Sequence, residues 1–192
     1  PIEYILSKYM IADPGTEFLY NSGGTNVLGV VIEDLTEMRL IDFANQYLFD
    51  PLNIEGGLWE TIAGGYLFAS GGLYLRPREL AKIGSLFLNN GYWGDRQIIS
   101  EEWITASTKE YIQTNGDLIG QAHAYGYQWW TMDFEIGEEI YPCFFAAGWG
   151  EQYMFILPGL NMMAIFNCGN FLEYGGVSAF FLMQEFILAS ME

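Results

Sequence analysis

Hydrophobic positions in the first half of the chain recur with the spacing of helices. Residues 25–36 are apolar on two sides, and the run is long enough to predict a buried helix rather than a strand. A second helix is predicted over about residues 40–48, where apolar side chains share one face. Residues 1–20 and the glycine-rich stretch 56–72 show neither period and are predicted to be irregular.

Two further helices are indicated by the residues at their ends. Pro77 is of a type favoured at the first helical position, and Asn90-Gly91 offers the left-handed residues that end a helix. A short fourth helix is predicted to start near Ser100, because serine is a good N-cap residue and acidic side chains follow it.

The last third of the chain changes to short apolar runs separated by turn residues. Residues 125–134 are aromatic and strand-like, and residues 177–191 predict a closing apolar helix. Three strands are predicted over residues 143–147, 152–157 and 161–167, with a tight hairpin at Pro158-Gly159. Helices followed by an antiparallel sheet and a helix define an α+β fold class. Three strands leave an edge that must be covered or paired, which hints at strands missing from this chain.

The composition favours a folded, strongly acidic protein. Hydrophobic residues make up 51% of the 192 residues, which is too many for a disordered chain. The formal net charge of −17 repels phosphate backbones, so no nucleic acid is expected as a partner. We find no apolar run of 18 residues in the sequence, so no membrane span is predicted.

Few residues offer metal or acid–base chemistry. Cys143 and Cys168 have neither the number nor the spacing of a zinc site or a disulfide scaffold. On three antiparallel strands in order they would lie on the two outer ones, beyond disulfide reach, so two free thiols are predicted. The single histidine, His123, lies in a polar stretch without a Gly-x-Ser-x-Gly elbow and is interpreted as a loop histidine. We therefore expect no metal and no cofactor.

A motif of another kind occupies residues 18–29, which read Phe-Leu-Tyr-Asn-Ser-Gly-Gly-Thr-Asn-Val-Leu-Gly. It resembles the Tyr-x-Asn or Tyr-x-Ser motif of the serine β-lactamase, penicillin-binding-protein and esterase family, in the branch of the 6-aminohexanoate-oligomer hydrolases. Three later segments resemble the family in the same order, at residues 49–54, 70–82 and 148–152. Each segment alone is weak, but four in order favour this family and its β-lactamase/transpeptidase-like fold.

The resemblance implies that a serine of a Ser-x-x-Lys motif attacks an ester or amide carbonyl and forms an acyl-serine intermediate. A serine hydroxyl needs a neighbouring base, and Tyr20 would serve as that base and then as the acid toward the leaving group. Ser22 would hydrogen-bond the lysine or the substrate, and the backbone N–H of Gln152 would be an oxyanion donor. The substrate-binding wall would be formed by Gly148, Trp149, Gly150 and Glu151.

The chain departs from the family pattern at two points. None of its eight serines has a lysine three residues later, so Ser-x-x-Lys does not occur within residues 1–192. In the family this motif lies upstream of the tyrosine. We therefore expect the C-terminal portion of one domain, with a helical subdomain over about residues 10–120 and strands plus the last helix over about 121–192. Glu151 replaces the glycine usual in this branch, and its carboxylate either opposes the negative charge of the intermediate or faces away.

Several functions stay open at this point. The chain is either a fragment of a serine hydrolase for small esters or amides, inactive by itself, or part of a non-catalytic β-lactamase-like protein that binds peptide or cell-wall fragments. The presence of Ser-x-x-Lys upstream would separate these two, and an unrelated α+β interaction domain is a third option. The family includes periplasmic and secreted proteins, but the sequence leaves compartment, substrate and oligomeric state open. Self-association through an exposed sheet face or edge is expected of the isolated chain.

Overall fold

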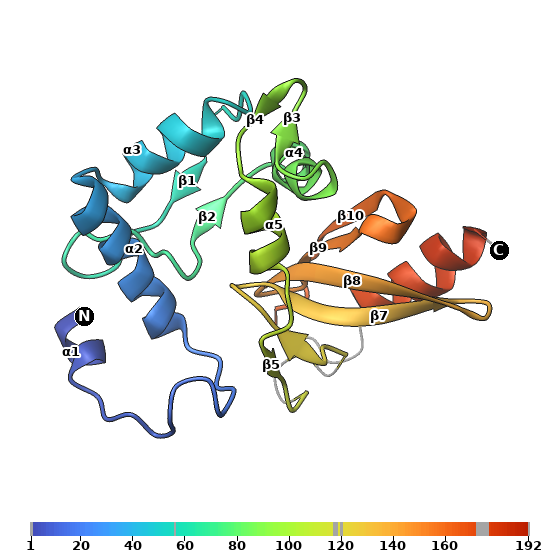
Figure 1. Ribbon diagram of the computed structural model, residues 1–192, viewed down its shortest axis with the longest axis horizontal. Helices are drawn as coiled ribbons and strands as arrows, with labels where there is room; N and C mark the ends of the chain where they lie inside the picture. Colours follow the sequence, from blue (N-terminus) through green and yellow to red (C-terminus); the bar gives the residue numbers. More distant parts are fainter. Residues whose placement is uncertain (1, 56, 117–118, 120, 172–176, 192) are drawn as a thin grey trace. The chain divides into compact units, whose positions relative to one another are not determined.

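The computed structural model describes residues 2–55, 57–116, 119, 121–171 and 177–191 (Figure 1). The chain folds as two compact units, Pro1–Glu79 and Leu80–Glu192. The predicted boundary between a helical and a sheet portion at about residue 120 stays a prediction.

The first unit is mainly helical. Its elements are α1 (Ile2–Leu6), α2 (Ser22–Thr36), α3 (Leu40–Ala44), a π-helical turn that continues α3 (Asn45–Phe49), and the two-stranded sheet of β1 (Leu58–Trp59) and β2 (Leu73–Tyr74). The predicted helices at 25–36 and 40–48 are thus confirmed as elements. The prediction that residues 1–20 are irregular was wrong for α1, which is too short to show a helical period.

The prediction that the helix at 25–36 is buried was wrong. Leu28 and Leu35 are 52% and 78% exposed, and only Asn26 and Gly29 of α2 are buried. The Asn26 side chain accepts a hydrogen bond from the backbone N–H of Ser70 at 3.1 Å. A Cβ on Gly29 would lie 2.9 Å from the Cβ of Ala69, so the backbone of α2 comes close to Ala69 at this glycine. The exposed apolar side chains of α2, Leu28, Val31 and Leu35, are spaced three and four residues apart and therefore share one face of the helix, opposite Asn26 and Gly29.

The second unit holds the large sheet and the helices that pack on it. The helices are α4 (Pro77–Leu88, which begins at the end of the first unit), α5 (Glu101–Ser107) and α6 (Ala179–Leu182), continued by a π-helical stretch (Met183–Leu188) and a 3₁₀ turn (Ala189–Met191). The strands are β3 (Tyr92–Trp93), β4 (Arg96–Gln97), β5 (Ile112–Gln113), β6 (Ala124–Tyr125), β7 (Trp130–Ile136), β8 (Glu139–Gly148), β9 (Gln152–Leu157) and β10 (Met162–Asn167).

The antiparallel sheet has six strands in the order β10-β9-β8-β7-β6-β5, so the prediction of three strands was too few. Two of the added strands contain only two residues each, too few to show alternation. The hairpin at Pro158-Gly159 is a 3₁₀ turn that ends at a left-handed Asn161, and β10 therefore starts one residue later than predicted.

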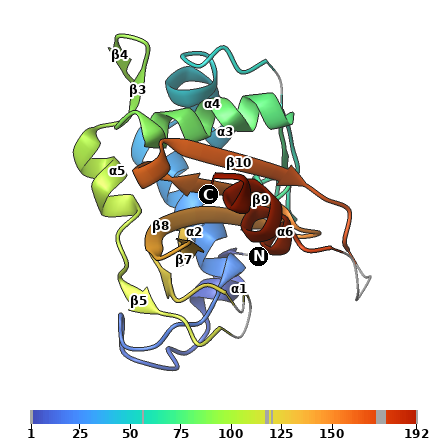
Figure 2. The same cartoon turned by 90° about the vertical axis from the view of Figure 1, so that its right-hand side faces the viewer.

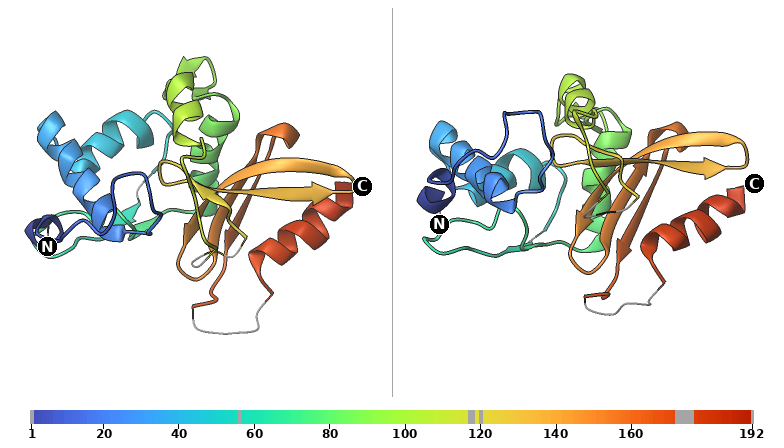
Figure 3. Two further views of the ribbon diagram at one scale, coloured as in Figure 1. Left: turned by 60° about the horizontal axis from the view of Figure 1, so that its bottom comes forward. Right: turned by 90° about the horizontal axis from the view of Figure 1, so that it is seen from below.

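Helices cover both faces of the sheet (Figure 2), and alternation along the strands explains which side chains each helix contacts. On the face of α4, the rings of Phe87 and Phe144 lie 5.9 Å apart. On the opposite face, Phe180 of α6 packs against Phe145 and Phe155, with ring centroids 5.6 and 5.1 Å away. Phe145 and Phe155 are fully buried. Figure 3 shows the C-terminal helical segment, coloured red, running along the sheet, as the predicted closing helix requires.

The predicted helix ends are confirmed. Asn90 and Gly91 have φ of 50° and 87° after α4, and the Ser100 side chain caps α5 by accepting from the Trp103 N–H at 3.2 Å. The two cysteines are free, as predicted, because Cys143 lies on β8 and Cys168 follows β10 with β9 between them. Among the helices that the structure describes, none combines the length and apolarity needed to cross a bilayer.

Candidate functional site

Tyr20 and Ser22 lie at the N-terminal end of α2 in the first unit. Asn21 between them is the N-cap residue, and its side-chain oxygen accepts from the Gly24 N–H at 3.1 Å. Ser22 is the first helical residue and is exposed, while Tyr20 is 42% exposed in the irregular segment before the helix. The side chain of Asn21 is therefore used for capping, whereas Tyr20 and Ser22 on either side of it carry hydroxyl groups at the surface.

The predicted wall residues form the turn between β8 and β9 in the second unit. Gly148 pairs with Gln152 across this hairpin. Gly150 and Glu151 both have left-handed backbones, with φ of 81° and 63°. Trp149 at the tip is 76% exposed, so its indole ring offers an apolar surface to solvent.

The backbone N–H of Gln152 points toward β8. The Glu151 carbonyl accepts from the Cys168 N–H at 3.4 Å on the side of β10, and in a trans peptide the next N–H points the opposite way. The Gln152 side chain donates to the carbonyls of Gly150, at 3.1 Å, and Cys168. To accept from the Gln152 N–H, an oxyanion would therefore have to bind on the β8 side of β9, beside Gly148. The role of this N–H as an oxyanion donor stays a prediction.

The carboxylate of Glu151 is held on the side of the turn where α6 begins. Its Oε2 accepts from the Asn170 side-chain amide at 3.0 Å and from the Ala179 backbone N–H at 3.2 Å. This geometry favours the expectation that the carboxylate faces away from the Gln152 N–H. Sequence reasoning missed both partners, because they lie 19 and 28 residues further along the chain.

The single histidine contacts a surface carboxylate. His123 Nε2 lies 2.7 Å from Glu110 Oε1, and both side chains are exposed to solvent, in keeping with a loop histidine. In the described parts of the chain, we find no three His, Cys, Asp or Glu side chains grouped as a metal site would require.

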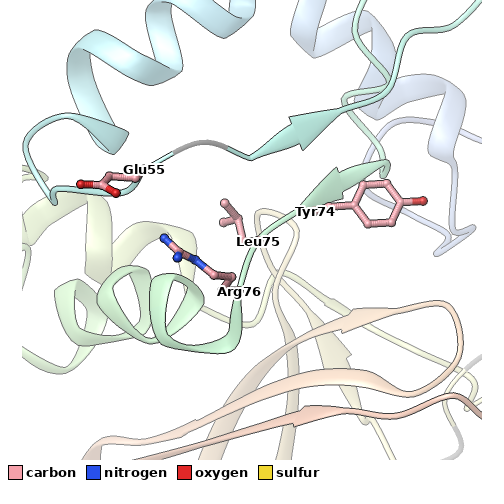
Figure 4. Close-up of a pocket in the computed structure, with 4 residues that line it drawn as sticks. All are labelled: Glu55, Tyr74, Leu75 and Arg76. Atoms are coloured by element: carbon pink, nitrogen blue, oxygen red, sulfur yellow. The ribbon is translucent and has the colours of Figure 1, made fainter.

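A pocket of about 520 Å³ in the first unit was not anticipated from the sequence, and it is lined by Glu55, Tyr74, Leu75 and Arg76 (Figure 4). Its polar groups do not converge. Figure 4 shows Tyr74 pointing away from Arg76, and the Tyr74 hydroxyl donates to Glu60 at 3.0 Å. Arg76 donates instead to the buried Glu79 at 2.5 Å. The Arg76-x-x-Glu79 spacing was the available signal for this ion pair.

Comparison with known proteins decides the family. The family model described as β-lactamase matches residues 2–168. The chain belongs to the β-lactamase family. This confirms the resemblance on which the four sequence segments agreed.

Relatives from several bacteria are similar to this β-lactamase-family chain. The 6-aminohexanoate-dimer hydrolase of Paenarthrobacter ureafaciens is 29% identical over 132 residues, which is 65% of this chain and 34% of that protein. A candidate 6-aminohexanoate-dimer hydrolase from Bacillus anthracis has a TM-score of 0.77 at 23% identity, covering 97% of this chain and 47% of its own. A candidate β-lactamase from Bacteroides dorei has a TM-score of 0.76 at 16% identity, with coverages of 98% and 64%.

The two solved structures are less than 25% identical to this chain, so the similarity to them shows the fold alone. The β-lactamase/transpeptidase-like α+β fold is thereby confirmed. The chain spans less than two thirds of the length of each of these three relatives.

Proposed function

We propose that this chain is part of a serine hydrolase that cleaves an ester or amide bond of a small molecule through an acyl-serine intermediate. The observation that carries the proposal is the exposed Tyr20–Ser22 motif at the start of α2, in a chain of the β-lactamase family. The position is chemically suitable, because the N-terminus of a helix carries a partial positive charge that favours anions.

In the proposed reaction, the Tyr20 oxygen takes the proton of the nucleophilic serine while the serine oxygen attacks the carbonyl carbon. A lysine ammonium beside the tyrosine would favour its phenolate form, and Ser22 would hydrogen-bond that lysine or the substrate. The tetrahedral intermediate then expels the alcohol or amine, which receives the proton from Tyr20. Water attacks the acyl-serine in a second round, releases the acid and restores the serine.

The serine and the lysine are proposed to come from sequence outside residues 1–192, since none of the eight serines has a lysine three residues later. This chain by itself is then expected to be inactive. The same absence motivates the second candidate, a non-catalytic protein that binds peptide or cell-wall fragments. Self-association also stays a prediction, for which the end strands β10 and β5 are the available edges.

The turn from Gly148 to Gln152 is proposed as the substrate wall. The exposed ring of Trp149 would pack against an apolar part of the substrate, and the Gln152 N–H would donate to the oxyanion. One relative is named for hydrolysis of a 6-aminohexanoate dimer. Linear amides of that class are therefore the first substrates to assay, alongside a chromogenic ester.

The test compares Tyr20→Phe with Tyr9→Phe in the complete protein. Tyr9 is a matched control because it is also a tyrosine of the first unit and is 95% exposed. Loss of a general base is expected to lower kcat about 10²–10⁴-fold in Tyr20→Phe, while Tyr9→Phe keeps its activity.

Intact mass after treatment with a fluorophosphonate locates the nucleophile. The complete protein is expected to gain one adduct on the serine of Ser-x-x-Lys, and the chain of residues 1–192 none. An adduct on a serine within residues 1–192 would contradict the proposal, as would full activity of Tyr20→Phe.

A further inference from the structure

Glu151 adopts a backbone conformation that residues with a side chain rarely take. Its φ of 63° lies in the left-handed region, where Cβ crowds the following carbonyl and where glycine is favoured. A carboxylate-bearing residue at such a position suggests that the side chain itself has a task. The contacts of Glu151 identify that task.

The side chain joins three segments that are distant in sequence. Oε2 of Glu151 accepts from the side-chain amide of Asn170, which follows β10, and from the backbone N–H of Ala179 at the start of α6. Hydrogen bonds to a charged acceptor are stronger than those between neutral groups. One carboxylate oxygen thus links the β8–β9 turn to both later segments.

Backbone bonds and packing connect the same segments. The Cys168 N–H donates to the Glu151 carbonyl at 3.4 Å, and the Asn170 N–H donates to the Gly150 carbonyl at 3.3 Å. The Phe171 ring lies so close over Gly150 that a Cβ there would come within 2.4 Å of it. Residues 168–171 therefore run along the turn. The Glu151 side chain connects the turn and these residues to the start of α6 by hydrogen bonds.

The electrostatic surroundings agree with this orientation. Burial raises the pKa of Tyr153 and of Cys168 above their ordinary values, and the negative charge of Glu151 adds to the rise in both cases. The two groups whose pKa the Glu151 charge raises thus lie on the side of the turn that faces β10 and α6.

We propose that Glu151 is a positioning residue, whose carboxylate holds the Trp149–Gly150 turn against residues 168–171 and the start of α6. The turn then presents the exposed Trp149 ring in one place. Glu151 itself does not touch the substrate. The link to catalysis rests on the proposed function, in which this turn is the substrate wall, whereas the hold on the turn stands on the contacts alone.

Hydrogen exchange in the complete protein tests the hold on the turn. Glu151→Gly removes the carboxylate and relieves the left-handed backbone, and Glu151→Gln keeps one acceptor oxygen. The backbone amide of Ala179, which loses its acceptor, is expected to exchange about ten- to a hundredfold faster in Glu151→Gly. The backbone amide of Asn170 donates to the Gly150 carbonyl and is expected to exchange faster as well, because the Asn170 side chain no longer anchors it to Glu151. Both effects are expected to recover in part in Glu151→Gln. The Phe181 amide, which donates to the Ser178 side chain, serves as an internal reference in the same helix. Unchanged exchange at Ala179 would overturn the proposal.

Kinetics in the complete protein test the link to the substrate. Glu151→Gly is expected to raise KM for the amide or ester several-fold more than it changes kcat, and Glu151→Gln to restore much of the loss. The control is Glu33→Ala, because the Glu33 carboxylate similarly accepts the N–H of Leu40, at 2.9 Å, at the start of another helix, and alanine removes this acceptor. Glu33→Ala is expected to speed exchange of the Leu40 amide without changing KM.

The outcomes separate the two proposals. Faster exchange at Asn170 and Ala179 together with the raised KM supports the positioning role. Faster exchange with unaltered KM and kcat in an active enzyme overturns it. A complete protein without any hydrolase activity would remove the proposed function, and the exchange measurement would then decide the hold on the turn by itself.

Discussion

Replacing Gly150 by alanine probes how the candidate turn is held. Gly150 has a φ of 81°, and an added Cβ would lie 2.4 Å from a carbon of the Phe171 ring. Gly137 is a matched control in the turn that precedes β8. It has a φ of 60°, and no described atom lies within 4 Å of an added Cβ. The two substitutions thus share the backbone cost and differ in the collision with Phe171.

The magnitude follows from these two parts. A Cβ at a left-handed residue costs about 1–2 kcal/mol, and the stiffer unfolded chain offsets about 0.4–1 kcal/mol of it. Gly137→Ala is therefore expected to lose about 0.5–1 kcal/mol. Phe171 is 50% exposed, so its packing covers on the order of 100 Å², worth up to about 2.5 kcal/mol. Gly150→Ala displaces the ring and loses at most about 3.5 kcal/mol from these two parts. The expected loss is about 2–3.5 kcal/mol, because the displaced ring regains some contacts elsewhere.

Urea unfolding followed by tryptophan fluorescence measures the difference. With a slope of about 2 kcal/mol/M, the midpoint is expected to fall by about 1–1.7 M in Gly150→Ala and by no more than about 0.5 M in Gly137→Ala. Equal midpoints for the two variants would refute the reasoning, because they would show that Phe171 does not pack on Gly150 in solution.

The remaining predictions concern acid and thiol chemistry. The Arg76 guanidinium bonded to Glu79 lowers the pKa of that carboxyl from 4.5 to about 2. The stability from this pair is therefore fully present above about pH 4.5 and is lost as the pH falls toward 2. Wild type is expected to exceed Glu79→Gln in urea midpoint at pH 5 and to lose this advantage near pH 2; an advantage independent of pH would contradict the assignment. Burial raises the pKa of Cys143 to about 12 and also raises that of Cys168, so a thiol reagent at pH 7.4 is expected to react slowly with the native chain. After unfolding it should count two thiols, and a count of none would refute the free cysteines.

Much of the local structure could be predicted because end signals act over a few residues. The cap at Ser100 and the left-handed stop at Asn90-Gly91 formed as expected, since each requires only the backbone of the next turn. The order of four family segments likewise sufficed for the fold and the family, because that order lies in the chain itself.

The candidate site likewise combines local features with features that depend on distant segments. The helix was predicted to start at residue 25, whereas Asn21 caps α2 and makes Ser22 its first residue. This cap acts over a few residues, but it was not used for the prediction. The orientation of Glu151 could not be predicted, and the sequence left two alternatives open. Its carboxylate depends on Asn170 and Ala179, which meet it only after β10 has paired with β9 and the last helix has packed on the sheet.

The sequence by itself thus determined the helices with clear ends, the α+β class, the family and the Tyr20 motif. Only the tertiary structure decided that the sheet has six strands, that α2 leaves Leu28 and Leu35 exposed, and which way Glu151 faces. The physical reason is range. Caps and periodicity arise from neighbouring residues, whereas strand pairing, burial and the partners of a carboxylate depend on segments brought together by folding.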